Sequence, residues 1–295
     1  MNSKMLIGTA MLLALAACGK APTAEENAVT ASDAANAAAP ASRAPVESKL
    51  SLVRLDCGSV DVADFSKSFS DQQIYPHGRK TLTDSCYVIT HGNQHLLWDT
   101  GLPAALKGQN PPASDGMTPG LQMTIPEQLA KLNLTPEDID IVGISHTHFD
   151  HTGQAASFPN ARLVVGKADF DATSGKDDPF KPWRVTGASV TAQDGDIDIF
   201  GDGSVTALFL PGHTPGHHAL LVKLASGPVL LTGDLYHATE ARAKRGVPPF
   251  NTSREQTLAS MDKFEALAKE YGAKVIIQHE LADIGKLPAF PKAAE

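Results

Sequence analysis

Residues 141–151 read IVGISHTHFDH, an apolar run that stops at a cluster of histidine and aspartate side chains. The run predicts a buried β-strand, and the end of a strand is where a rigid sheet presents side chains to a shared cleft. In the tight turn that follows, His146 and His148 can converge on one ion. Asp150 and His151 follow in the same turn and can point at a second ion. The segment therefore predicts a metal site at a strand end.

Three further apolar runs also stop at a potential metal ligand. Residues 208–212, 230–233 and 275–278 lead into His213, Asp234 and His279. The candidate ligands are thus His146, His148, Asp150, His151, His213, Asp234 and His279. Imidazole and carboxylate donors without thiolate suit zinc, and manganese, iron or cobalt stay open as alternatives. This set exceeds the need of one tetrahedral zinc ion and suits two divalent metal ions that share a carboxylate.

The composition limits the classes of protein. The chain has 295 residues, is 42% hydrophobic and 20% charged, and carries a formal net charge of −8. This is enough material for one large domain or two small ones, and it is too apolar for a disordered chain. Because nucleic-acid-binding proteins normally have a basic footprint, the acidic balance predicts no nucleic-acid partner.

The first residues have the character of an export signal. Lys4 precedes an apolar run that is too short to span a bilayer and that ends in LAAC at residues 15–18. The ending resembles a bacterial lipobox, which implies removal of residues 1–17 and lipidation of Cys18; an ordinary secretory peptide is the alternative. Gly19 then implies, by analogy, an exported lipoprotein on the periplasmic face of the bacterial envelope, held in the outer membrane by its lipid anchor.

Residues 18–48 are rich in alanine with scattered prolines and predict a flexible tether, which leaves residues 49–295 as one folded domain. Strands are expected at residues 82–90, 96–98, 139–145, 161–165, 205–210, 219–224, 228–232 and 274–278. Helices are expected at residues 125–132, after a capping box at Thr124, and between Ser253 and Gly272. Consecutive strands with interspersed helices favour an α/β domain in which sheet packs on sheet with helices outside.

Cys57 and Cys86 are the two cysteines of this domain. An oxidising periplasm would permit a disulfide between them, but the default expectation is a pair of buried free thiols on strands. The distance between them decides the question, and sequence alone does not show it.

Five motifs together resemble the metallo-β-lactamase superfamily over residues 50–279. They are WDTG at residues 98–101, HTHFDHTG at 146–153, PGHTPGH at 211–217, TGD at 232–234 and QH at 278–279. The resemblance implies an αββα sandwich, two mixed β-sheets flanked by helices. It assigns one metal ion to His146, His148 and His213 and the other to Asp150, His151 and His279, with Asp234 as the bridge. It also implies that Asp99 supports the ligand loops.

The resemblance implies a dinuclear metal-dependent hydrolase in which a hydroxide between the metal ions attacks the substrate, with Asp150 or Asp234 accepting or returning a proton. Residues 234–237, 251–257 and 276–280 resemble the N-acyl homoserine lactonase group, which implies a quorum-quenching lactonase acting on a small amphipathic acyl lactone. The alternatives are a phosphotriesterase resembling methyl parathion hydrolase, with less support a β-lactamase, and a non-enzymatic lipid-anchored binding protein. A homodimer is left open.

One departure from the lactonase pattern concerns the catalytic proton donor. Many lactonases carry a tyrosine three residues after the bridging aspartate, where this chain has His237, with Tyr236 one position earlier. The spacing favours His237 over Tyr236, and the alternative is that Tyr236 packs in the core while His237 only lines the pocket. Residues 102–123 form a loop that could wall an acyl-chain pocket or serve as a mobile cover; its apolar members are Leu106, Met117, Leu121 and Met123.

Overall fold

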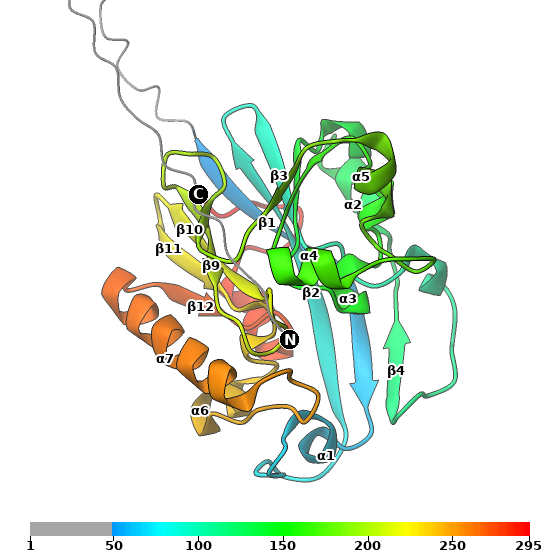
Figure 1. Cartoon of the computed structure of the whole chain (residues 1–295), viewed down its shortest axis with the longest axis vertical. Coiled ribbons are helices and arrows are strands. Elements are labelled where there is room, and N and C mark those ends of the chain that lie inside the picture. Colours follow the sequence, from blue (N-terminus) through cyan, green and yellow to red (C-terminus); the bar gives the residue numbers. More distant parts are fainter. Residues whose placement is uncertain (1–48) are drawn as a thin grey trace, which may run out of the picture. The chain divides into compact units, whose positions relative to one another are not determined.

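Two mixed β-sheets pack face to face in the computed structural model, which describes residues 49–295 (Figure 1). The strands of the larger sheet are β1 (Leu50–Val62), β2 (Lys80–His91), β3 (Gln94–Trp98), β4 (Met117–Gly120), β5 (Ile141–Gly143), β6 (Arg162–Val165) and β7 (Val190–Ala192). Those of the smaller sheet are β8 (Ile197–Asp198), β9 (Val205–Phe209), β10 (His218–Leu224), β11 (Gly227–Leu231) and β12 (Lys274–Ile276). Their spatial orders are β4-β1-β2-β3-β5-β6-β7 and β12-β11-β10-β9-β8.

Both sheets combine antiparallel and parallel pairs. In the larger sheet β2 and β3 form an antiparallel hairpin, whereas β3, β5, β6 and β7 pair in parallel. In the smaller sheet only the pair of β11 and β12 is parallel among the described strands. The carboxyl ends of β5 and β12 therefore approach one region from the two sheets, and both strands run directly into the candidate ligands.

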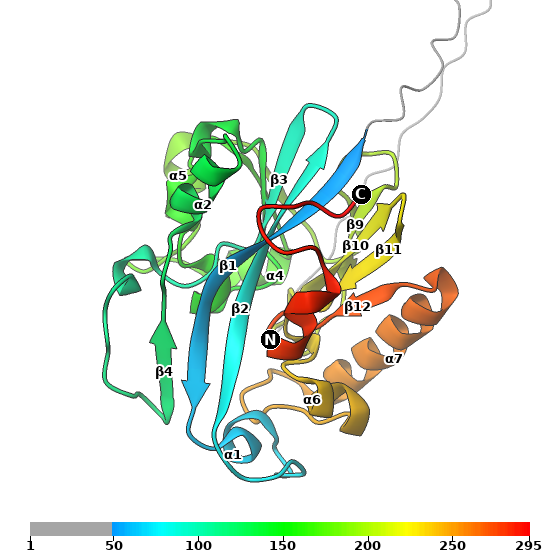
Figure 2. The same cartoon turned by 180° about the vertical axis from the view of Figure 1, so that it is seen from behind.

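Helices cover the outer faces of both sheets. The α-helices are α1 (Phe65–Phe69), α2 (Ile125–Lys131), α3 (Phe149–Thr152), α4 (Lys167–Ala172), α5 (Lys181–Thr186), α6 (Thr239–Lys244) and α7 (Arg254–Tyr271). Short 3-10 turns are η1 (Ala104–Leu106), η2 (Pro136–Asp138), η3 (Ala155–Ser157), η4 (Gly233–Leu235) and η5 (Leu281–Lys286). Figures 1 and 2 show α7 flanking the smaller sheet, with α2 and α5 on the side of the larger sheet.

Three hydrophobic clusters define the layers. The first fills the space between the sheets with side chains from both, such as Trp98 of β3 and Leu220 of β10. The second packs α2 and α5 on the outer face of the larger sheet, through side chains such as Leu129 and Trp183. The third packs α7 on the outer face of the smaller sheet. The predicted αββα sandwich is therefore confirmed.

Helix α7 begins and ends where its sequence predicts. The side chain of Ser253 accepts a hydrogen bond from the backbone N–H of Gln256, which satisfies one of the free donors of the first turn. At the other end Gly272 adopts a left-handed conformation, with φ of 57°, which closes the helix without the steric cost of a Cβ atom. Met261 and Phe264 lie on its buried face.

The segment predicted as a long loop contains strand β4. Its residues pair antiparallel with the end of β1, from Ser59 opposite Gly120 to Val62 opposite Met117. The strand lies at the edge of the sheet. Proline is tolerated on an edge strand because its missing N–H can face away from the neighbouring strand, where no hydrogen bond of the sheet is lost. Local sequence gave no strand signal here because the pairing partner, β1, supplies the structure.

Cys57 and Cys86 form a disulfide with a Cα–Cα distance of 5.8 Å, so the expectation of free thiols is wrong. Their strands β1 and β2 are antiparallel neighbours, and the register places Cys86 opposite Leu55. A bulge between Asp56 and Gly58 then brings Cys57 within bonding distance. Only the register, which depends on long-range pairing, reveals this proximity.

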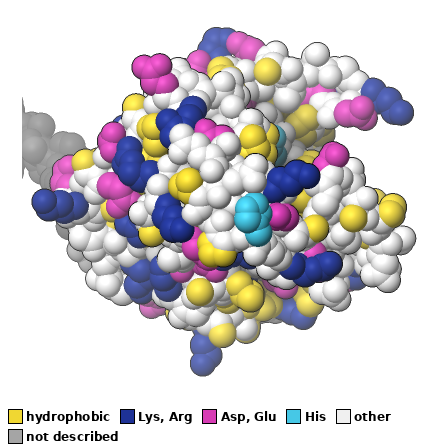
Figure 3. Space-filling view, turned by 90° about the horizontal axis from the view of Figure 1, so that it is seen from below, with side chains coloured by type: hydrophobic (Ala, Val, Ile, Leu, Met, Phe, Trp, Pro, Cys, Tyr) yellow, Lys and Arg dark blue, Asp and Glu magenta, His cyan; other side chains and the backbone are white. Residues whose placement is uncertain are grey.

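Residues 1–17, Cys18 and the tether at 18–48 lie outside the described residues, so the export signal, the lipid anchor and the envelope location stay predictions. Among residues 49–295, no helix combines the length and the apolar character needed to cross a membrane. On the face shown in Figure 3, Lys and Arg side chains are interspersed with Asp, Glu and hydrophobic side chains.

Candidate metal centre

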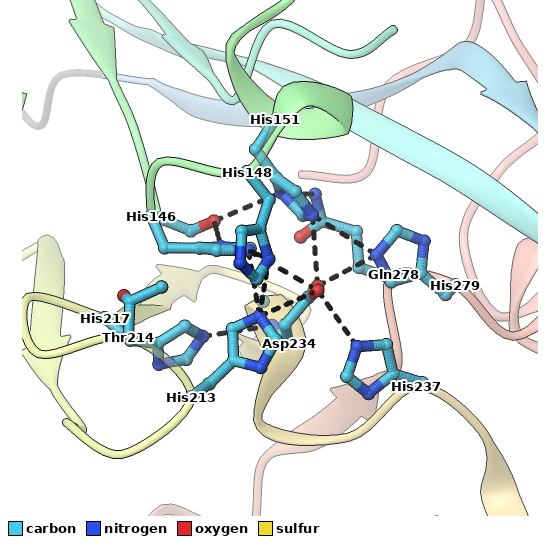
Figure 4. Close-up of polar contacts among 12 residues, drawn as sticks. His146, His148, His151, His213, Thr214, His217, Asp234, His237, Gln278 and His279 are labelled. Carbon is cyan, nitrogen blue, oxygen red and sulfur yellow. Dashed lines mark hydrogen bonds and ion pairs between the residues drawn. The ribbon is translucent and has the colours of Figure 1, made fainter. Parts of the chain in front are cut away.

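All the candidate ligands meet at the ends of strands from both sheets. Figure 4 labels each of them except Asp150. The turn after β5 and the short helix α3 carry residues 146–151, while His213 follows β9. Asp234 lies in η4 directly after β11, and His279 follows β12. These side chains fall into two groups whose donor atoms lie within 4.8 Å of one another. The predicted ligands are thus brought together as the sequence suggested.

The first group contains His146, His148, His213 and Asp234. Three ring nitrogens, Nε2 of His146, Nδ1 of His148 and Nε2 of His213, lie 3.0 to 3.1 Å apart. Oδ2 of Asp234 lies 3.4 Å from the His146 nitrogen and 3.3 Å from the His213 nitrogen. A tetrahedral zinc ion with Zn–N distances of about 2.0–2.1 Å separates its ligand atoms by about 3.3 Å. The spacing of the group fits such an ion.

The second group contains Asp150, His151 and His279. Nε2 of His151 lies 3.2 Å from Nε2 of His279, and Oδ1 of Asp234 lies 3.1 and 2.8 Å from these two nitrogens. Asp234 therefore turns one carboxylate oxygen toward each group. Figure 4 shows this carboxylate between the two sets of rings. That is the arrangement expected of a carboxylate shared by two cations.

Partners outside the two groups fix the orientation of the rings. Nδ1 of His151 donates to Asp99 at 3.0 Å, Nδ1 of His213 donates to Oδ1 of Asn251 at 2.9 Å, and Nδ1 of His279 donates to a backbone carbonyl at 2.8 Å. Because Nδ1 of each ring is held by its outer partner, Nε2 is the atom that faces the group and that can bind a cation. Outer partners of this kind are typical of histidine ligands in metal sites. The donor set therefore fits metal ions.

Asp99 connects the two sheets at this point. Its Oδ1 accepts from the backbone N–H of Ser145 at 2.7 Å, and its Oδ2 accepts from His151 and from the side-chain amide of Gln278 at 2.7 Å. Asp99 is fully buried and adopts a positive φ of 60°, which is uncommon for a residue with a side chain. The geometry matches the supporting role that the resemblance implies for this residue.

Electrostatics in the cluster centre on Asp234. Burial lowers the pKa of His148 to about 4. Burial also acts to lower the pKa of His151 and of His279, but the negative charge of Asp234 opposes it at both residues. The pKa of His151, which Asp99 raises further, is well above its usual value. The pKa of His279 is raised to about 9. Burial acts to raise the pKa of Asp234, but the surrounding histidines hold it well below its usual range. The cluster is thus built to keep this carboxylate ionised.

The two candidate proton donors point in opposite directions. The hydroxyl of Tyr236 donates to Glu265 of α7 at 3.0 Å, and its ring packs against Phe264. His237 instead faces the cluster, with Nε2 3.0 Å from Oδ2 of Asp234. Tyr236 has extended backbone angles, and successive side chains of an extended segment point to opposite sides. The expectation that Tyr236 is a catalytic residue is therefore corrected, because its side chain packs in the core against α7.

An apolar chamber of about 220 Å³ opens beside the ligands. Its polar lining comes from the cluster, including His237. Its apolar lining comes from side chains of distant segments, namely Val60, Phe69, Leu82, Met117, Phe149 and Phe250. Of the loop residues expected to wall a pocket, Met117 lines this chamber, whereas Leu121 is buried in the fold. A site that joins polar ligands to an apolar chamber suits an amphipathic substrate.

Sequence reasoning missed a buried acid, Asp84 of β2. This side chain has no exposed surface, and neither of its carboxylate oxygens has a hydrogen-bond partner among residues 49–295. Burial raises the pKa of Asp84 well above its usual range, against the opposing effect of His151 and His279. The sequence signal that could have revealed Asp84 is the polar run TDS at residues 83–85, which lies inside a buried strand. Burial therefore favours the neutral form of Asp84, a carboxyl that lies within electrostatic range of His151 and His279.

Comparisons with known proteins agree with this geometry. The model of the metallo-beta-lactamase superfamily matches residues 81–279, more than half of the chain. The N-acyl homoserine lactonase AttM of Azorhizobium caulinodans is 36% identical over 180 residues, which span 56% of this chain and 66% of that relative. The chain therefore belongs to the metallo-beta-lactamase superfamily.

Solved structures show the same fold. A structure of an N-acyl homoserine lactone hydrolase, with the product N-hexanoyl-L-homoserine bound at its catalytic metal centre, has a TM-score of 0.71 at 22% identity and covers 84% of this chain and 100% of its own. A structure of AidC, a dizinc quorum-quenching lactonase with a bound product, has a TM-score of 0.57 at 17% identity and covers 84% and 91%. The predictions of a metallo-hydrolase and of a likeness to the lactonase group are confirmed.

Proposed function

We propose that this protein hydrolyses the lactone ring of N-acyl homoserine lactones with two bound divalent metal ions. The observation that carries the proposal is the position of Asp234, whose two oxygens face two separate groups of ligands at the wall of an apolar chamber. The relatives named above, which are lactonases, support the choice of substrate.

The residues that would hold the first ion are His146, His148 and His213, and Asp234 would be shared with the second. The second ion would be held by Asp150, His151 and His279. Zinc suits this donor set, and manganese, iron or cobalt are the alternatives. When bound, the pair of ions supplies a hydroxide at neutral pH and polarises the carbonyl of the substrate.

The remaining steps use the protein's own side chains. The apolar chamber binds the acyl chain and orients the lactone ring toward the ligands, because the polar residues of its lining are metal ligands or His237 beside them. His237, with Nε2 3.0 Å from Oδ2 of Asp234, donates a hydrogen bond to the ring oxygen that leaves as an alkoxide. Asp150 or Asp234 would accept a proton from the attacking oxygen and return it to the alkoxide, which leaves the opened product as a carboxylate with a free hydroxyl group.

Binding of zinc to the metal-free protein at pH 7 should release protons from the second group. The charge of Asp234 raises the pKa of His151 and of His279, which favours the protonated rings without metal, and a protonated ring must lose its proton before Nε2 can bind a cation. Calorimetric titrations in buffers with different ionisation enthalpies measure this release. A binding enthalpy that is independent of the buffer would contradict the protonation states assigned here.

Replacing Met117 by tryptophan should alter chain-length preference. The larger side chain fills part of the chamber, so kcat/KM for a long-chain acyl lactone should fall about tenfold more than for a short-chain one, a difference of about 1.4 kcal/mol. Leu106→Trp, in the same segment but outside the chamber lining, is the matched control. Equal losses for both chain lengths would show that the acyl chain does not occupy the chamber.

The substrate is tested by following hydrolysis with the zinc-loaded protein on three classes of compound. They are acyl homoserine lactones of different chain length, a paraoxon-type phosphotriester and a cephalosporin. We expect rapid lactone opening and weak action on the other two. Fast phosphotriester cleavage beside slow lactone opening would reassign the substrate to the phosphotriester class, and fast cephalosporin cleavage would reassign it to the β-lactams.

A further inference from the structure

The disulfide lies at an irregularity of β1. Along the pair of β1 and β2 the register passes from Asp56 opposite Ser85 to Gly58 opposite Asp84, so Cys57 is the extra residue of a bulge. Its sulfur is bonded to Cys86 of β2, and both cysteines are fully buried. Bulges next to functional sites redirect side chains, and here a covalent bond holds the redirected residue in place.

The bulge supports the turn that follows β3. The backbone N–H of Leu102 donates to the carbonyl of Cys57 at 3.2 Å. A Cβ atom added to Gly101 would lie 2.5 Å from Cβ of Cys57 and 3.0 Å from its sulfur. The backbone of this turn therefore rests directly on the disulfide, at a distance that only glycine permits.

The same turn holds a ligand of the second group. The N–H and the hydroxyl of Thr100 both donate to the carbonyl of His151, at 2.7 and 3.0 Å, while Asp99 binds the ring of His151. Asp99 and Gly101 both adopt positive φ angles, of 60° and 61°. A residue such as Asp99 keeps this conformation only where its surroundings enforce it. The disulfide supports the same turn two and three residues further on, at Gly101 and Leu102.

We propose that the Cys57–Cys86 disulfide is a positioning element for the second group of metal ligands. It holds the bulge against the turn at residues 99–102, and the turn holds both the backbone and the ring of His151. The inference rests on the proposed two-metal site. In the first group, His213 is held instead by Asn251 from the segment before α7. Loss of the disulfide should therefore affect the two metal ions unequally.

The test compares the parent protein with Cys57→Ala/Cys86→Ala in the full chain, by zinc titration against a competing chelator. We expect one of the two stepwise zinc affinities to fall at least about tenfold, which is the scale of losing an outer partner of a metal ligand. The other affinity should change by less than about twofold. Leu221→Ala, a core substitution under α7, controls for a general loss of stability; it should lower Tm and leave the ratio of the two affinities unchanged.

Cys57→Ala/Cys86→Val is a second version that fills more of the vacated volume. Unchanged zinc affinities in a folded double variant would overturn the inference and leave the two-metal proposal intact. Failure of both double variants to fold would also overturn it, because the bond would then serve the whole fold. A parent protein that binds no second zinc ion would overturn both proposals.

Discussion

Replacing Asp234 by asparagine should lower kcat/KM for lactone hydrolysis by more than about 100-fold, the scale seen when even an outer partner of a metal ligand is lost. The two oxygens of this carboxylate face different ligand groups, with Oδ2 3.3 Å from His213 and Oδ1 2.8 Å from His279. Asparagine keeps the shape of the side chain but removes its charge and one of its two acceptor oxygens. Metal analysis should show fewer than two zinc ions per chain.

The control for this variant is Asp198→Asn, whose carboxylate accepts hydrogen bonds from the backbone of Gly201 and Gly203 in a surface turn. This change should leave metal content and kcat/KM close to those of the parent. If Asp234→Asn retained two zinc ions and the parent's activity, the shared-carboxylate arrangement would be wrong.

Replacing His237 by phenylalanine should lower kcat by about 100-fold, the lower end of the contribution of a positioned proton donor. The ring of His237 lies parallel to that of His279, with centroids 5.6 Å apart, and contacts Phe69 at 4.8 Å. Phenylalanine preserves this packing while removing the N–H beside Asp234. The loss should therefore appear in kcat, with a smaller change in KM.

The matched comparison is Tyr236→Phe at the adjacent position. Its hydroxyl binds Glu265, so its removal should leave kcat within about twofold and lower the free energy of unfolding by about 1 kcal/mol. Steady-state kinetics and chemical denaturation of the two variants separate the roles. The reverse order, with the larger loss of kcat in Tyr236→Phe, would return the donor role to the tyrosine.

The ligand cluster was predictable because its signals are local. Each of the four strand ends combines a short apolar run with an adjacent histidine or aspartate, and the structure brings all four together. Helix α7 was predictable for the same reason, since Ser253 is a local start signal and Gly272 a local stop signal. The sandwich follows from the resemblance of these motifs to the superfamily.

Features that depend on contacts between distant segments could not be predicted. Strand β4 exists through its pairing with β1, and the disulfide exists through the register of β1 against β2. Counting along the chain ranked His237 above Tyr236, but only the extended backbone showed that the tyrosine side chain turns toward α7. The burial of Asp84 likewise depends on the layers that cover β2.

The central claim is that two metal ions bound by this cluster are required to open acyl lactones. Its most direct test is to strip the protein of metal with a chelator, return zinc stepwise, and follow proton release from an N-acyl homoserine lactone. We predict no hydrolysis by the stripped protein and activity that rises until two zinc ions are bound per chain. Full lactone hydrolysis by the stripped protein, or none with both ions bound, would contradict the account.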